Sequence, residues 1–428
     1  MRQIATPVGA LATEREGWMR TAPCVDSHRV ARLAYSRSMS EHDVLRFTNG
    51  LSEKLASRSR HVCLFLGAGA SRACGLPDVA GLTEHVRDSL SGDQLLAFER
   101  LLKGRNLEQV LSRLRRIAAL LEASADTVDG LTGNQAGALD VEICRIIIEK
   151  LTAGTVKHEP MLRLASWAAR ADYRRPVEIF TVNYDLLAET SLEALSVPYF
   201  DGFVGTLQAR FRGDLVEVVA EADLGTNAAA TPLPSFLVRL WKLHGSVNWV
   251  WSDDDNPAVV RLGRPAPTSR TAAIYPSDAK YEESRRVPFL VLQDRLRRAL
   301  NEPETLTLIA GYAFGDQHLN ETLFDTARRR PRSELVVFCY STIPDEVAAL
   351  AITTPNIQVV TQHEAILGGI RGPWKVSQSI PDDVWDNDAF LLGDFEYLTR
   401  FLARSSPPLG ELEARLADLL AKAADSDA

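Results

Sequence analysis

The sequence predicts an α/β fold, a Rossmann-like, doubly wound parallel sheet with an inserted helical module and a helical C-terminal tail. Short apolar runs recur along the chain, and helical text lies between several of them. The runs are continuous rather than alternating, which is typical of strands buried on both faces of a parallel sheet. A glycine-rich turn follows the first run. At 428 residues and 46% hydrophobic, the chain can bury a large core.

The first expected strand, residues 62–66, ends in the turn Gly67-Ala68-Gly69-Ala70-Ser71. Glycines let backbone N–H groups approach a pyrophosphate, and the N-terminus of a following helix adds positive potential. The third glycine position of a dehydrogenase fingerprint is occupied by Arg72, and this loop has no Walker Lys-Ser pair. The turn therefore predicts a phosphate-bearing ligand without indicating hydride transfer or ATP hydrolysis. A tight turn that binds nothing remains the alternative.

Sequence with helical periodicity follows this turn. We expect residues 82–172 to form a helical module inserted after the first strand. In 107–124 the leucines recur at steps of three and four residues, the spacing of one helix face. The stretch 141–154 repeats that spacing, and the polar, Gly-bearing stretch 124–139 is expected to be a loop between the helices. The module is expected to interrupt a main domain that spans residues 41–370.

The remaining strands are expected in the apolar or β-branched runs 176–185, 235–246, 304–316, 333–341 and 356–361. Helical text between several of these runs supports parallel connections. The stretches 198–234 and 250–288 are rich in Pro, Gly and Asp. We expect these two stretches to be long excursions over the active face of the sheet.

The two ends of the chain differ from the main domain. Residues 1–40 contain no continuous apolar segment, which excludes a secretory signal. We expect them to be a flexible N-terminal extension or to precede a later start at Met39, with a basic organelle presequence as the alternative. Residues 371–428 are expected to form the helical tail. Two amphipathic helices are predicted there, at 388–405 and 409–424, separated by Ser405-Ser406-Pro407-Pro408.

Polar clusters stand directly after three more expected strands: Asn183-Tyr184-Asp185, His244-Gly245-Ser246 and the run from Gly311 to Asp316. The carboxyl ends of parallel strands meet at one edge of the sheet, where ligands bind. We therefore expect these clusters and the Gly67 turn to converge on one crevice. Each residue also has an ordinary structural interpretation, such as a turn for Asn183 or a helix cap for Asp185. For Asp316, binding a ribose and capping the following helix both stay open.

Composition narrows the functional class. The formal charge of −8 argues against a protein that coats nucleic acid, and no apolar run approaches the roughly 20 residues of a membrane-spanning helix. The five cysteines are scattered and none has C-x-x-C spacing, so no metal site is expected. Unpaired thiols suit a reducing compartment, and we expect a cytoplasmic protein without membrane or direct nucleic-acid partners.

Taken together, the polar clusters resemble the NAD-site motifs of the sirtuin superfamily, in their order. The matching blocks are Gly67-Ala68-Gly69-Ala70-Ser71 with Gly75-Leu76-Pro77-Asp78, Thr181-x-Asn183-Tyr184-Asp185 and Leu243-His244-Gly245-Ser246. The run 311–320, "GYAFGDQHLN", is similar to a fourth block of the bacterial sirtuin-like branch. The resemblance extends from about residue 61 to residue 341 and implies that NAD⁺ is the ligand.

Two departures separate the chain from the protein-deacylase branch. That branch usually carries a four-cysteine zinc module, which this chain cannot supply. Deacylases also tend to have Phe-Arg after the Gly-x-Pro-Asp segment, whereas Asp78 is followed here by Val79-Ala80-Gly81. Both differences favour the bacterial sirtuin-like branch that hydrolyses NAD⁺, commonly in anti-phage defence. The chain looks most like stand-alone subunits of that branch, which implies a homo-oligomer and a possible HerA-type ATPase partner.

The resemblance implies a role for each motif residue. Asn183 would bind ribose hydroxyls or position water, and His244 would be the general base, since imidazole titrates near neutral pH. The ligand-binding residues would be Gly67, Ala68, Gly69, Ser71, Asp78, Asp185, Gly245, Gly311 and Asp316. Of these, Ser71 and the backbone N–H groups around Gly69 would hold phosphate. Asp185 would accept a hydrogen bond from the nicotinamide carboxamide.

The expected reaction is hydrolysis of the nicotinamide–ribose bond, which gives nicotinamide and ADP-ribose. Two alternatives remain at this point. One is NAD-dependent deacylation or ADP-ribosyl transfer, and the other is a non-catalytic scaffold that senses NAD⁺ or ADP-ribose. Because an ungated NAD⁺ hydrolase would harm its own cell, we also expect a loop, either 70–82 or one of the two long excursions, to block the site at rest.

Overall fold

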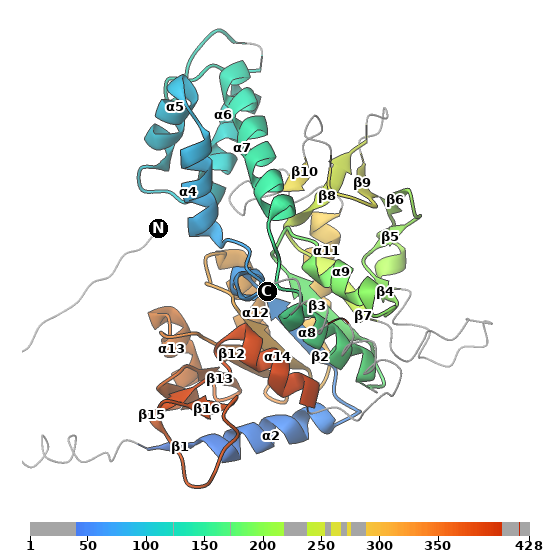
Figure 1. Ribbon diagram of the computed structural model, residues 1–428, viewed down its shortest axis with the longest axis vertical. Helices are drawn as coiled ribbons and strands as arrows, with labels where there is room; N and C mark the ends of the chain where they lie inside the picture. Colours follow the sequence, from blue (N-terminus) through green and yellow to red (C-terminus); the bar gives the residue numbers. More distant parts are fainter. Residues whose placement is uncertain are drawn as a thin grey trace, which may run out of the picture. The chain divides into compact units, whose positions relative to one another are not determined.

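The computed structural model describes residues 40–122, 124–171, 173–217, 238–252, 258–266, 272–274, 288–404 and 419. The chain divides into two units, Met1–Ser40 and Glu41–Ala428, and every element named below lies in the second (Figure 1). The predicted extension lies outside the described residues, apart from Ser40. So does the predicted helix at 409–424, apart from Leu419.

A central sheet of parallel strands organises the second unit. Its inner strands are β7 (Val238–Lys242), β3 (Val177–Thr181), β2 (Val62–Leu66), β11 (Leu306–Ala310), β12 (Glu334–Phe338) and β13 (Ile357–Val360), in that spatial order. Each neighbouring pair is parallel. In chain order this arrangement reads 3-2-1-4-5-6, the order of doubly wound dinucleotide-binding sheets. The predicted parallel sheet is confirmed.

Every residue of β2 is buried, which explains why its sequence is apolar throughout. Val62, Leu64 and Leu66 enter the core on one face of the sheet, whereas Cys63 and Phe65 enter the core on the other. Side chains alternate across a strand, so a strand covered on both faces needs apolar residues throughout.

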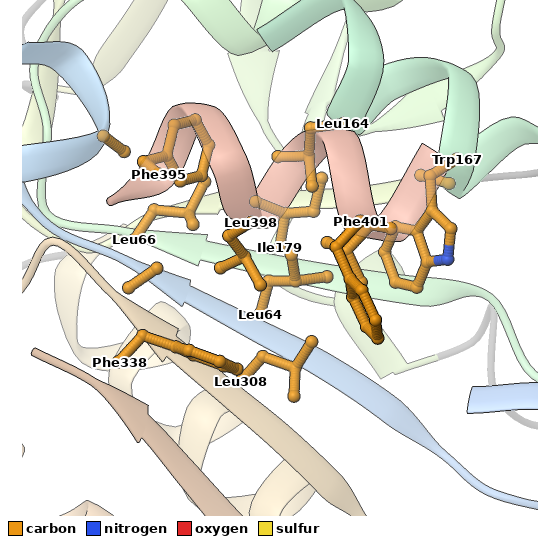
Figure 2. Close-up of a cluster of buried hydrophobic side chains, with 14 of the residues drawn as sticks. Leu64, Leu66, Leu164, Trp167, Ile179, Leu308, Phe338, Phe395, Leu398 and Phe401 are labelled. Atoms are coloured by element: carbon orange, nitrogen blue, oxygen red, sulfur yellow. The ribbon is translucent and has the colours of Figure 1, made fainter. Parts of the chain in front are cut away.

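Helices cover both faces of the sheet. One core contains residues of α2 (Val44–Ala56), α3 (Ala68–Ala73), α8 (Glu159–Arg170), α9 (Leu187–Ala194) and α14 (Phe395–Arg404). The other contains residues of α11 (Phe289–Asn301), α12 (Gln317–Arg329) and α13 (Asp345–Thr353). Figure 2 shows Phe395, Leu398 and Phe401 of α14 above Leu64 and Leu66 of β2. The C-terminal helix is therefore part of the main core.

Short strands extend the sheet at both edges. β4 (Tyr199–Phe200) pairs with β7, and beyond β13 lie β14 (Glu364–Leu367), β15 (Ile370–Lys375) and β1 (His42–Asp43). β15 crosses the domain boundary predicted after residue 370, and β16 (Trp385–Asp386) and β17 (Ala389–Phe390) follow it. Within the described residues of 371–428, helix is therefore confined to α14 and Leu419.

A two-residue hairpin turn explains why the domain boundary predicted after residue 370 falls inside the sheet. Gly368 and Gly369 join β14 to β15 with φ of 59° and 82°. Positive φ at both central residues is the geometry of a type I′ turn, which suits the twist of antiparallel strands. The Gly-Gly pair between apolar residues was the available sequence signal.

A second, antiparallel sheet corrects the prediction of long excursions at 198–234 and 250–288. Its strands are β10 (Ala272–Ile274), β8 (Gly245–Trp251), β9 (Val259–Leu262), β6 (Gln208–Phe211) and β5 (Phe203–Val204), in spatial order. Several of these strands are two to four residues long. Strands this short are easily hidden by the Pro-, Gly- and Asp-rich text around them.

Four helices between β2 and β3 pack around a core of their own: α4 (Val79–Ser89), α5 (Gly92–Leu102), α6 (Leu107–Leu120) and α7 (Gly133–Ala153). Side chains of β8 and β9, including Val247 and Val260, complete this core. The prediction joined α8 to the same module, but α8 packs on the main sheet. The predicted range 82–172 therefore spans two packing groups.

Candidate functional site

The loops after β2 and β11 meet at the switch point of the sheet, where the chain order reverses direction. The N–H of Gly69 donates to Gly311 O at 2.8 Å, and the N–H of Gly67 donates to Ala310 O at 3.0 Å. A Cβ on Gly67 would lie 2.5 Å from Gly311 O, and Gly311 has φ of +65°. Close backbone contact therefore explains why both loops carry glycine.

This geometry changes the role predicted for the glycines. Gly67, Gly69 and Gly311 do lie together, with Ala68 between the first two as the first residue of α3. However, the N–H groups of Gly67 and Gly69 are already donated to backbone oxygens. These two N–H groups join the strand ends, and phosphate binding by the loop stays a prediction.

Asn183 lies at the carboxyl end of β3 and is held by the Gly67 loop. Its side-chain nitrogen donates to Gly67 O at 2.9 Å and to Ser71 Oγ at 2.8 Å. Its backbone N–H donates to Thr181 Oγ1 at 3.0 Å. Both amide hydrogens are therefore used, which leaves Oδ1 as the atom that can accept from a ribose hydroxyl or a water.

Ser71 and Asp185 continue the hydrogen-bond network of the Asn183 side chain. The Ser71 hydroxyl donates to Asp185 Oδ2 at 2.5 Å, and Asp185 Oδ1 accepts from the Leu187 N–H at 3.0 Å. Both residues are buried. The hydroxyl hydrogen of Ser71 and both carboxylate oxygens of Asp185 are thus engaged inside the protein. Through these hydrogen bonds they hold Asn183 in place, and the phosphate and carboxamide contacts expected of them stay predictions.

His244 and Asp316 form a buried pair. His244 Nε2 lies 3.2 Å from Asp316 Oδ2, and both side chains are less than 10% exposed. Asp316 Oδ1 accepts from the N–H groups of His318 and Leu319, so Asp316 caps α12. Of its two predicted roles, the cap is therefore confirmed.

The same pair determines the tautomer of His244. Asp316 accepts a hydrogen bond, so Nε2 carries the ring proton and Nδ1 carries the lone pair. Nδ1 is buried and has no hydrogen-bond partner within the part of the chain that the structure describes. A ring nitrogen without a partner is the atom of His244 that would accept a proton, once a reacting group comes within hydrogen-bond distance of this buried position.

The other two predicted residues lie at element starts. Gly245 follows His244 with φ of +91° and opens β8. Asp78 caps α4 by accepting from the Gly81 N–H at 2.9 Å, and its other oxygen lies 3.3 Å from Arg72. Neither contact joins Asp78 to Asn183 or His244.

Sequence reasoning missed two residues beside the site. Lys242, directly before Leu243-His244, is a buried lysine that contacts the backbone of the Asn183 loop. Tyr184 donates its hydroxyl to Glu108 Oε1 of α6 at 3.1 Å and so ties the loop to the helical group. A lysine at the end of a strand whose residues are all buried was the signal for Lys242, and Tyr184 has no sequence signal.

A cysteine near the site is inert as a nucleophile. Burial, reinforced by the Asp185 carboxylate, raises the pKa of Cys74 to about 12. The thiol is therefore protonated at neutral pH, and a thiolate mechanism has no support here.

The strand order, the glycine loops at the switch point and the polar side chains after β3 and β7 define a doubly wound α/β protein with a ligand site at the switch point. A family model described as SIR2-like domain matches residues 177–360, from the first residue of β3 to the last residue of β13. The match supports membership of the Sir2 superfamily. It covers less than half of the chain and leaves out β2 with its glycine loop. Among curated proteins, none matches this sequence.

Two further observations concern the described residues alone. No helix among them is both long and apolar enough to span a membrane. Nor do they contain a group of three or more His, Cys, Asp or Glu side chains placed to hold a metal ion.

Proposed function

We propose that this protein hydrolyses NAD⁺ at the nicotinamide–ribose bond and releases nicotinamide and ADP-ribose. The observation that carries the proposal is that two oriented polar side chains follow the neighbouring strands β3 and β7. Asn183 is fixed through its side-chain nitrogen, and His244 is oriented by Asp316 with the buried Nδ1 left without a partner among the described residues. The SIR2-like match adds support, since Sir2-like proteins are generally NAD-dependent enzymes.

Each residue has a defined task in the proposed reaction. The bond between ribose C1′ and the nicotinamide nitrogen breaks, and its electron pair stays on nicotinamide. A water oxygen then forms the new bond to C1′ and gives up a proton, which His244 Nδ1 accepts. Asn183 Oδ1 would accept from a ribose hydroxyl or from that water, which orients it without adding a charge.

The cellular role belongs to the same proposal and rests on the sequence resemblance. We propose that NAD⁺ depletion serves anti-phage defence in the cytoplasm, within a homo-oligomer that pairs with a HerA-type ATPase. A main domain interrupted by the helical group α4–α7 remains our proposal for the organisation of the chain.

Purified full-length protein incubated with NAD⁺ tests the chemistry, with nicotinamide measured by chromatography. We expect N183A and H244A each to lower nicotinamide release about 100-fold or more. H318A is the control, because the His318 side chain is 60% exposed and lies outside the proposed machinery. All three variants should keep the thermal unfolding temperature of the wild type within a few degrees.

The proposal fails if the wild type releases no nicotinamide in any oligomeric state or with its partner present. Release that depends on an added acyl-lysine peptide would instead indicate deacylation. NAD⁺ binding without turnover would indicate a scaffold.

A further inference from the structure

Lys242 is a buried cation at the end of a central strand. It is the last residue of β7, and its side chain is 3% exposed. Lysine is almost never fully buried unless its charge is paired, because desolvation of an ammonium group is costly. Glu189 of α9 supplies the pairing charge, with Oε1 3.0 Å from Lys242 Nζ.

The remaining contacts of this ammonium are with backbone oxygens of the Asn183 loop. Lys242 Nζ donates to Asp185 O and lies 3.5 Å from Tyr184 O. These carbonyls belong to the two residues directly after Asn183. Lys242 therefore holds the backbone of that loop and has no described contact with the side chain of Asn183.

Two residues that follow His244 in the sequence also donate to the Tyr184 carbonyl. It accepts from the Val247 N–H at 2.9 Å and from Ser246 Oγ at 3.3 Å. Lys242 precedes His244 by two residues, and Ser246 and Val247 follow it by two and three. Donors on both sides of the His244 turn thus converge on one carbonyl of the Asn183 loop.

We propose that Lys242 is a positioning residue that sets Asn183 relative to His244 for bond cleavage, an inference that rests on the proposed function. The ammonium, the Ser246 hydroxyl and the Val247 N–H form a clamp between the strand ends of β3 and β7. Lys242 differs from the other two donors because it also reaches the Asp185 carbonyl. Small errors in the geometry of reacting groups lower the rate of catalysis far more than they lower binding.

The variant K242M removes the donor but keeps an unbranched apolar side chain. We expect kcat for nicotinamide release to fall about 100-fold, with KM changed about threefold or less. R239M is the matched control. Arg239 lies on the same strand, is equally buried, and stands next to Glu178 at the opposite end of the strand. Glu178 keeps His61, Trp241 and Arg295 as donors, so this variant should fold and keep kcat.

The double variant K242M/E189M separates positioning from stability. It removes both buried charges, so the unfolding temperature should return toward that of the wild type. The kcat should stay low, because the Asp185 carbonyl still lacks the Lys242 donor and the Tyr184 carbonyl keeps only Ser246 and Val247. Recovery of kcat together with stability would overturn the proposal and leave Lys242 a purely structural role. Unchanged kcat in K242M would overturn it as well.

Hydrogen–deuterium exchange tests the clamp without relying on turnover. Peptides that cover residues 181–187 and 243–248 should exchange faster in K242M than in the wild type and in R239M. If the wild type cleaves no NAD⁺, the proposed function fails, and faster exchange would still support the clamp. Equal exchange in K242M and in the wild type would refute the clamp itself.

Discussion

At the scale of single residues, the contact between His244 and Asp316 decides which ring nitrogen is open. Asp316 uses one oxygen to cap α12 and the other to accept from His244. The rigid start of a helix therefore orients the imidazole. A carboxylate that fixes the tautomer of a neighbouring histidine is a recurring arrangement at catalytic sites, because it leaves the opposite ring nitrogen ready to accept a proton.

D316N tests this orientation. The amide oxygen can still accept from the backbone N–H groups of α12, so the cap is kept. The amide nitrogen now donates to His244 Nε2, which places the ring proton on Nδ1 and removes the base. We expect nicotinamide release to fall about 100-fold, with little change in unfolding temperature. A large loss of stability together with intact kcat would contradict the tautomer argument.

At the scale of elements, the junction between the loops of β2 and β11 brings the site together. Gly67, Gly69 and Gly311 let the two backbones meet, and Asn183 is then anchored to Gly67 O. α14 covers β2 from one face, with Leu398 packed in the core that contains Leu64 (Figure 2). Elements distant in the sequence thus support the loop that holds Asn183.

G311A is expected to disrupt this junction. Its Cβ would lie 2.5 Å from the Ala70 nitrogen, at a φ of +65° that a side chain tolerates poorly. We expect the free energy of unfolding to fall by about 3 kcal/mol, measured by urea denaturation. G315A, four residues further along, is the control, because no atom lies within 4 Å of its Cβ. Similar losses in both variants would argue against the junction.

At the scale of the whole molecule, a buried ionic cluster lies toward the amino-terminal ends of the central strands, opposite the site. Glu178, near the start of β3, accepts from His61 Nε2 at 2.9 Å, Trp241 Nε1 at 2.7 Å and Arg295 Nε at 2.9 Å. Burial disfavours the imidazolium of His61, but contacts with Cys63 and Glu178 outweigh it and raise the pKa of His61 to about 10. Burial also opposes the Glu178 carboxylate, yet His61 and Arg295 hold its pKa well below the usual range.

This cluster predicts how stability depends on pH. Because the folded protein raises the pKa of His61 from 6.5 to about 10, the contribution of His61 is complete below pH 6.5 and is lost as the pH rises toward 10. H61Q should lower the free energy of unfolding by about 3 kcal/mol at about pH 6, and by much less at about pH 10. Denaturation curves of H61Q and of the control H363Q, at an exposed histidine, measure this difference. A constant difference across the pH range would contradict the assignment.

Much of the fold could be predicted from the sequence. The inner strands are continuous apolar runs, and the polar clusters directly after them had to lie at one edge of a parallel sheet. β5, β6, β9 and β10 escaped prediction because two to four residues carry too little periodicity. The β14–β15 hairpin also escaped prediction, although β15 has six residues. Gly368-Gly369 was a local signal for the hairpin, whereas the pairing of β6 with β9 depends on residues far along the chain.

The sequence by itself determined the parallel sheet and the group of residues at its carboxyl edge, including Asn183 and His244. Only the tertiary structure decided what each of them does. Ser71, Asp185 and the N–H groups of Gly67 and Gly69 form internal hydrogen bonds, while the buried His244 Nδ1 has no partner among the described residues. The physical reason is that a strand end is a local property, read from nearby residues. The partner of a buried polar group is set by packing between distant segments, as for Lys242 with the carbonyls of Tyr184 and Asp185.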